Sequence, residues 1–171
     1  MPRTLIKLYL YFGLSLILFF VLLSSDFVSR ELIQPFTGFV AFFSSLVLNV
    51  FGSETWVAGT RLLSGDYGIN VVDGCNGAFA TAILLSGIIA YPAKTRAKLT
   101  GAVLGIPAVF LLNQLRVVSL FLLGKSHPAL FNEVHVYVWQ PIVIIFAIFV
   151  WDFWARHFVR KSEIVKGSVP G

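Results

Sequence analysis

Apolar residues in this chain gather into five long stretches that are separated by short polar segments. A helix needs about 20 predominantly apolar residues to cross a bilayer, and each stretch comes close to that length. The pattern therefore predicts five helices. They cover residues 5–23, 32–51, 75–93, 99–123 and 136–159.

The composition indicates that these helices lie in a membrane. Hydrophobic residues make up 57% of the chain and charged residues only 12%, with a mean hydropathy of +0.86. Soluble domains are about a quarter charged, so too few ionised groups remain here to cover a water-facing surface. We expect one integral membrane domain over residues 1–171. The stretch 5–23 is long for a secretory signal and no clear small-residue cleavage site follows it, so it is predicted to be retained.

The net charge of +5 is explained by membrane orientation rather than by nucleic acid. Basic residues cluster in the first seven residues, in "KTRAK" and in the C-terminal segment that begins "RHFVRK". Lys and Arg collect in cytoplasmic loops. No glycine-rich phosphate loop, RNA-binding signature or zinc-finger spacing is present in the sequence. All three basic clusters reach the cytoplasmic side only if four of the stretches cross and 32–51 does not.

The stretch 32–51 has a pattern that suits a helix in the outer interface. An apolar stripe runs along it beside a smaller, more polar stripe that includes Thr37, Ser44 and Asn49 at helical spacing. Such a helix lies in the membrane interface, or dips into the bilayer and returns.

The segment 56–74 is predicted to form a small extracytoplasmic hairpin. Two short apolar runs, 56–63 and 69–72, flank "SGDYG", which has turn chemistry. The expected fold is therefore all-α, with four transmembrane helices, an outer interfacial helix and this hairpin. The transmembrane helices are 5–23, 75–93, 99–123 and 136–159.

The only cysteine, Cys75, stands at the start of the third stretch, directly after Asp73 and Gly74. In the middle of a helix a cysteine is usually a small buried hydrophobe. In a first turn, unpaired backbone N–H groups and the helix dipole favour an anion, and they can lower a thiol pKa from about 8.5 towards neutrality. No disulfide can form within the chain. The position favours a nucleophile that is open to the outside.

Arg116 lies inside the fourth stretch with apolar residues on both sides. A guanidinium at that depth costs roughly 2.5–3.5 kcal/mol even on lenient insertion scales. Asn113 and Ser119 lie three residues before and after it, so the three form one polar stripe. Snorkelling to the surface is the structural alternative. The stripe favours a functional arginine that faces the bundle interior.

His135 begins the fifth stretch, with Tyr137 and Trp139 close behind it. Alone it suits a structural histidine beside aromatic-belt anchors. Beside an outer cysteine and an intramembrane arginine, it suits a general acid or base. Asn76 and Asp73 are expected either to orient the reactive groups or to cap the helix. No close ligand pair suggests a metal, and His127 and His157 are interpreted as bystanders.

Three segments resemble the motifs of the exosortase and archaeosortase family. They are "CNGAFATAILLSGIIAYP", "NQLRV" and "VHVYVWQ". The first matches Cys-small-Gly at Cys75, the second matches Asn-x-x-Arg at Asn113 and Arg116, and the third supplies His135. The resemblance covers roughly 52–159. Many members are longer, carry serine after the cysteine and carry glycine soon after the histidine. The short length and "HVYVWQ" are most similar to the exosortase H branch, which is associated with IPTLxxWG-type signals in Gram-negative bacteria.

The resemblance implies a cysteine transpeptidase or protease at the outer face of the cytoplasmic (inner) membrane. Its substrates would be exported proteins whose C-terminal sorting signal has a short motif, an apolar helix and a basic tail. Cys75 would form a thioester, Arg116 would stabilise the oxyanion, and His135 would protonate the leaving amine. The acceptor would be an amine on a surface glycan or membrane lipid, or water, and neither metal nor cofactor is needed. The supporting residues expected beside the catalytic three are Asp73, Asn76, Asn113 and Tyr137.

A different class of function also fits the residues taken without the resemblance. In a non-enzymatic subunit of an export or polysaccharide-assembly system, Arg116 would be a structural ion-pair member with Glu133 as its partner, and Cys75 would be incidental. The presence of proteins with the matching three-part C-terminal end in the same genome would distinguish the two.

Overall fold

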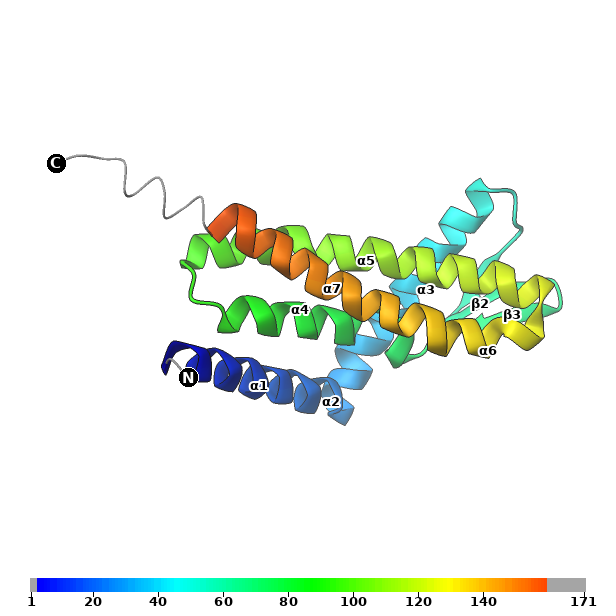
Figure 1. The fold of residues 1–171 in the computed structure, drawn as a ribbon. Helices are drawn as coiled ribbons and strands as arrows, with labels where there is room; N and C mark the ends of the chain where they lie inside the picture. Colours follow the sequence, from blue (N-terminus) through cyan, green and yellow to red (C-terminus); the bar gives the residue numbers. More distant parts are fainter. Residues whose placement is uncertain (1–2, 160–171) are drawn as a thin grey trace. The chain divides into compact units, whose positions relative to one another are not determined.

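The computed structural model describes residues 3–159, which form helices and one small sheet (Figure 1). The basic residues Arg160, Lys161 and Lys166 lie outside this described part. The main helices are α1 (Arg3–Leu23), α3 (Gln34–Val50), α4 (Ala78–Ala90), α5 (Thr95–Ser126) and α7 (Gln140–Trp154). Short helical pieces extend or connect them: α2 (Asp26–Val28), η1 (Ser29–Ile33), η2 (Asp73–Cys75), η3 (Pro128–Leu130), α6 (Phe131–Glu133), η4 (Val134–Trp139) and η5 (Ala155–Val159).

The chain is an all-helical integral membrane protein, apart from its small sheet. In the described part, four helical segments are long and apolar enough to cross a membrane: Leu5–Leu23, Asp26–Val50, Thr95–Ser126 and Pro128–Val159. The number of such segments agrees with the four predicted transmembrane helices, but one of the four segments is a different part of the chain. The segment predicted at 75–93 contains only the 13 residues of α4 as regular helix, or about 20 Å of length. The stretch predicted to lie in the interface belongs instead to a continuous helical segment of 25 residues.

The helix-rich unit contains α1, α4, the first half of α5 and most of α7. Aromatic side chains near the end of α7 connect the helices of this unit. Trp154 Nε1 donates a hydrogen bond to the carbonyl oxygen of Ala97, 2.7 Å away, and both Trp151 and Trp154 meet the ring of Tyr91 edge-on. Gly87 lies against the indole of Trp151, where a Cβ would come within 2.8 Å of the ring.

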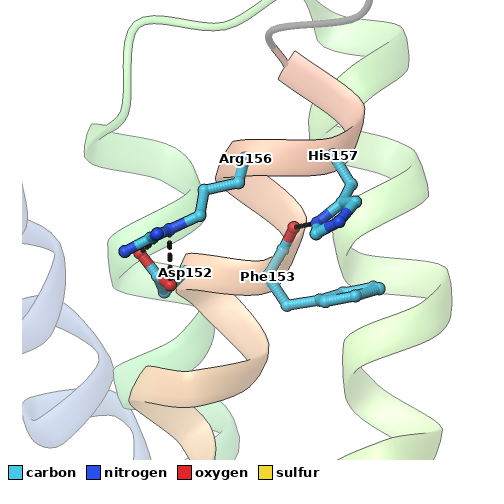
Figure 2. A network of polar contacts seen from close by, with 4 residues as sticks. All are labelled: Asp152, Phe153, Arg156 and His157. Carbon is cyan, nitrogen blue, oxygen red and sulfur yellow. Dashed lines mark hydrogen bonds and ion pairs between the residues drawn. The ribbon is translucent and has the colours of Figure 1, made fainter.

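These contacts bring basic segments together at one end of the helix-rich unit. The start of α1 and the end of α4 share an apolar cavity of about 250 Å³ with Trp151. The Trp154 hydrogen bond holds the end of α7 beside the start of α5. Where α7 continues into η5, Arg156 pairs with Asp152 at 2.8 Å and His157 bonds the carbonyl of Phe153 (Figure 2). The "KTRAK" segment and Arg156 therefore share one end of this unit.

The sheet-containing unit consists of residues 22–78 and 110–143. Its antiparallel sheet has the order β1 (Trp56–Ala58), β2 (Arg61–Ser64), β3 (Tyr67–Asn70). The predicted hairpin is thus a three-stranded meander, because the run 56–63 breaks into two strands at Gly59. Gly59 and Gly65 take positive φ values of 64° and 56°, which the tight two-residue turns require. The second turn falls within "SGDYG", as predicted.

Side chains from α3, the sheet and α5 form the core of the sheet-containing unit. Cys75 packs against this core. The buried residues of the core are Val40, Ala41, Leu48, Leu62, Val71, Val117 and Phe121.

Helix α3 buries its polar side chains and exposes its apolar ones. Thr37 and Ser44 are at most 1% exposed, whereas Phe39, Phe42 and Leu46 are more than half exposed. A helix in water shows the opposite arrangement, so the outer face of α3 suits a lipid environment. Its polar stripe therefore serves contacts within the protein, which matters for the site below.

Candidate active site

Cys75 is the last residue of the 3-10 turn η2 and lies just outside α4. Its backbone N–H donates to the carbonyl oxygen of Val72 at 2.7 Å. Helix α4 begins only at Ala78, whose N–H is accepted by the side chain of Asn76 at 2.9 Å. Asn76 therefore caps the helix, as one of the two interpretations from sequence proposed. The thiol stands in the entry loop rather than in the first helical turn, where the sequence placed it.

The structure brings Cys75, Arg116 and His135 together from three separate elements. The Sγ atom of Cys75 lies 2.9 Å from Nε2 of His135, which is presented by the π-helical turn η4. Arg116, on α5, points an Nη2 donor at the same sulfur over 3.6 Å. Wide π-type turns occur frequently at functional sites, because they displace a side chain from regular helical register. A thiol, a basic nitrogen and a fixed positive charge thus meet at one sulfur atom.

Asn113 fixes the backbone that holds the thiol. One turn before Arg116 on α5, its Nδ2 donates to the carbonyl oxygen of Cys75 at 3.0 Å, and its side chain is fully buried. The loop comes so close that a Cβ on Gly77 would lie 3.2 Å from the side chain of Asn113. Gly77 also takes φ +86°, which favours glycine. Asn113 and Arg116 therefore act on the same residue from one face of α5, as their spacing predicts.

Arg116 does not pair with Glu133, the partner that a structural role would give it. Its side chain is 3% exposed, whereas Glu133 is exposed on α6. Within the described residues, no hydrogen bond or ion pair links the two. The Nε donor of Arg116 is buried without a protein partner. A buried guanidinium with a free donor beside a thiol is an arrangement suited to binding a transient negative charge.

Burial raises the pKa of the Cys75 thiol above its ordinary value, and this is the largest effect on it. The positive charge of Arg116 and a backbone hydrogen bond at Val72 lower the pKa in part. The sequence favoured a lowered pKa, and that expectation is wrong for the resting protein, because desolvation disfavours the thiolate more than the charge and the hydrogen bond favour it. Burial therefore favours the neutral thiol in the resting protein, and His135 Nε2 is placed to accept its proton.

We expect the alkylation rate of Cys75 by iodoacetamide to keep rising with pH beyond about 8.5, the ordinary thiol pKa. The thiolate is the reactive form, and its pKa is raised. Because the chain has one cysteine, the rate reports this site alone. Arg116→Ala should move the midpoint to still higher pH. A wild-type rate that levels off near pH 7 would instead show a preformed thiolate–imidazolium pair.

The remaining residues expected from sequence lie as follows. The side chain of Asp73 lies outside the described part, although its backbone begins η2. Tyr137 is on η4 but is 78% exposed, and it makes no described contact with Cys75, Arg116 or His135. His127 and His157 bond only to neighbours in their own segments. Among the described side chains, which do not include Asp73, no three from His, Cys, Asp or Glu gather as metal ligands would.

Thr37 also belongs to the site, through its contact with Asn76, although it lies in none of the three motifs. It is 1% exposed on α3, donates to the carbonyl oxygen of Ile33 at 2.7 Å, and accepts from Nδ2 of Asn76 at 2.9 Å. Asn76 is thus held at both ends, by Thr37 and by the first turn of α4. The signal in the sequence was the polar stripe of α3, which includes Thr37, but spacing along one helix does not name a partner 39 residues away.

Thr37→Val is expected to slow any reaction at Cys75 on the order of tenfold, with Thr37→Ser close to wild type. Valine keeps the shape but leaves the amide of Asn76 buried without its acceptor, so the loop that holds the thiol loosens. The measurements are the alkylation rate of Cys75 and the kcat for its substrate. Thr100→Val is the matched control, since that hydroxyl bonds only the Arg96 carbonyl of its own helix. Equal effects of the two valine variants would contradict a positioning role.

Together, fold and site define a multi-helix membrane protein in which a buried arginine and a histidine meet a single thiol. The family model of the transmembrane exosortases, Transmembrane exosortase (Exosortase_EpsH), matches residues 6–151, a span that includes all three residues. The chain belongs to this family, as its motifs predicted. No curated protein and no solved structure matches the chain.

Proposed function

We propose that the protein is a membrane-embedded cysteine transpeptidase or protease that removes the C-terminal sorting signal of exported proteins through a thioester on Cys75. One observation supports this most strongly. The sulfur of Cys75 lies 2.9 Å from Nε2 of His135 and 3.6 Å from a guanidinium nitrogen of Arg116. A nucleophile, a base within hydrogen-bond reach and a charge stabiliser are the parts that acyl transfer needs.

In the first half-reaction, His135 Nε2 accepts the thiol proton as Sγ attacks the carbonyl carbon of the scissile peptide. Charge develops on the carbonyl oxygen, and the buried guanidinium of Arg116 stabilises it in surroundings where little water screens the interaction. The protonated His135 then donates its proton to the leaving amine, and the C–N bond breaks. The N-terminal part of the substrate remains on Cys75 as a thioester.

In the second half-reaction, an acceptor attacks the thioester. His135, now neutral, takes a proton from the attacking amine or water, and Arg116 again stabilises the oxyanion. The C–S bond breaks and Cys75 leaves as a thiolate, which recovers its proton from His135. An amine on a surface glycan or lipid gives a transpeptidation product, and water gives a hydrolysed one.

The site is proposed to face the outside of the cytoplasmic membrane. Arg96 marks the basic start of α5, and Arg116 follows it by 20 residues of the same helix. Twenty residues of α-helix span about 30 Å, the thickness of the hydrocarbon core. With "KTRAK" cytoplasmic, Arg116 lies at the opposite interface, where the membrane helix of a sorting signal joins its exported domain.

In intact cells, Cys75 should then react with a membrane-impermeant maleimide. Protection of Cys75 until the cells are opened would place the site inside.

The experiment that tests the activity is trapping of the intermediate. A tagged protein with the three-part C-terminal end, taken from the same genome, is co-expressed with the full chain. We expect a shortened product and a covalent adduct on Cys75 that hydroxylamine releases, as it does thioesters. Shortening that leaves Cys75 unmodified at every time point, or no shortening of any such protein, would contradict the proposal.

A further inference from the structure

The sheet beside the site has two edges. The β1 side is hydrogen-bonded to a helix, whereas β3 contacts the rest of the described chain through side chains such as Tyr67, which meets Phe121 edge-on. On the β1 side, Asn49 and Ser45 of α3 hydrogen-bond the backbone and side chain of Thr55, directly before the strand. The turn after β1 also packs on α3, since the carbonyl oxygen of Gly59 lies 3.4 Å from the Cβ position of Gly38. The edge of β1 is thus anchored to a helix.

The other edge, β3, directs backbone hydrogen-bonding groups away from the sheet. Ser64 and Tyr67 flank a two-residue turn, so they form a hydrogen-bonded pair, and pairing alternates from there. The bond from Val71 N–H to the Thr60 carbonyl oxygen, 3.0 Å long, agrees with this alternation. The N–H and C=O groups of Gly68 and Asn70 therefore point outward. Both residues are exposed, and no described backbone group bonds to those of either residue outside the sheet.

Apart from its short length of four residues, this edge lacks the usual protection against pairing with another strand. Natural edges are kept short or are blocked by lysine, proline, a bulge or a covering element. The sequence of β3, "YGIN", contains no charge and no proline, and its register with β2 has no bulge. Unpaired N–H and C=O groups in an extended row are complementary to one kind of ligand, an extended polypeptide.

The edge leads directly to the nucleophile. After Asn70, Val71 is buried and Val72 remains extended and 47% exposed, and the next residues form the turn that ends at Cys75. Cys75 follows Asn70 by five positions, which is at most about 17 Å of chain. A strand paired with β3 would reach the sulfur with about five residues of its own. A short recognition motif has this length.

We propose that the free edge of β3 binds the segment just N-terminal to the scissile bond of the substrate by strand addition. This inference rests on the proposed function. It assigns the binding site for the N-terminal part of the substrate, which forms the thioester with Cys75. The segment N-terminal to the scissile bond suits this edge because it must stay bound until an acceptor attacks the thioester. The C-terminal side leaves after cleavage, and its apolar helix belongs in lipid rather than along a sheet edge.

The test is a scan of a synthetic peptide with the IPTLxxWG-type signal or the matching signal of a processed substrate. Each non-proline residue before the scissile bond is N-methylated in turn, and binding to full-length Cys75→Ala in detergent is measured. N-methylation removes one backbone donor, so we expect binding to weaken by about three- to tenfold at alternate residues and to change little at those between. This period of two is the signature of strand pairing.

A variant of the protein gives a second measurement of the same edge. Asn70→Pro removes the outward N–H, whereas Asn70→Ala keeps it and removes only the side chain that accepts from Thr60. The proline variant should raise KM several-fold over the alanine variant. Losses without a period of two, together with equal KM values, would overturn the inference while leaving the activity intact. A substrate that the wild type does not process at all would overturn the proposed function, and the inference with it.

Discussion

Cys75→Ala is expected to abolish processing of the sorting signal, with a loss of at least about 10⁴-fold in kcat. No other cysteine in the chain can replace it. Alanine removes the atom that lies 2.9 Å from His135 and 3.6 Å from Arg116, so the two remaining groups have no nucleophile to activate or stabilise. Cys75→Ser should also fail, because a hydroxyl is far less acidic than a thiol and its site already raises the pKa of the thiol. The assay is shortening of the tagged substrate.

Loss of folding must be separated from loss of chemistry in this series. Cys75 is only partly buried and alanine is smaller, so the amount of protein in the membrane should equal that of wild type. Substrate binding should survive, because the proposed β3 edge is intact. Unchanged processing by Cys75→Ala at equal protein levels would eliminate the nucleophile and make a non-enzymatic membrane subunit the better hypothesis.

Arg116→Ala is expected to lower kcat by about 10²- to 10³-fold, which is typical for loss of an oxyanion stabiliser. The buried guanidinium points at Cys75 and keeps a free Nε donor, so its charge lies close to the position of the proposed oxyanion. Arg116→Lys should recover part of the rate, since it keeps the charge without the planar donor set. The measurement is kcat and KM for the tagged substrate, and KM should change little.

Arg96→Ala is the matched control for the arginine. It removes the same side chain from the same helix at an exposed position. Its effect on kcat should be small. A large loss in Arg116→Ala that appears in protein level or in KM rather than in kcat would assign Arg116 a structural role.

The sequence predicted the fold class and indicated two residues that the structure places beside Cys75, but not the local structure around them. Arg116 could be found because a charge inside an apolar stretch is costly, and Asn113 because it lies one helical turn away. Both statements concern a single helix, where spacing along the chain determines direction in space. The contact of Cys75 with His135 joins residues 60 apart, and it was expected from the predicted membrane topology and the family resemblance rather than from spacing along one helix.

The features that sequence did not predict depend on packing between distant segments. A strand of three residues, such as β1, is too short to show alternation. Helix α4 begins after the Asn76 cap and the positive φ of Gly77. The apolar residues around these two positions form one continuous stretch in the sequence, so the start of the helix could not be predicted. Thr37 looked like part of an interfacial stripe because the pattern of α3 alone does not tell whether polar residues face water or another helix.

With the orientation proposed above, the 20 residues of α5 between Arg96 and Arg116 set the distance from the cytoplasmic charge boundary to the arginine of the candidate site. The proposed depth of cleavage would then be set by the length of this helix. Selection of a target would depend on how far its own helix lifts the cleavage motif out of the lipid, as well as on the motif itself. Two signals with the same motif but helices of different length would not be equal substrates.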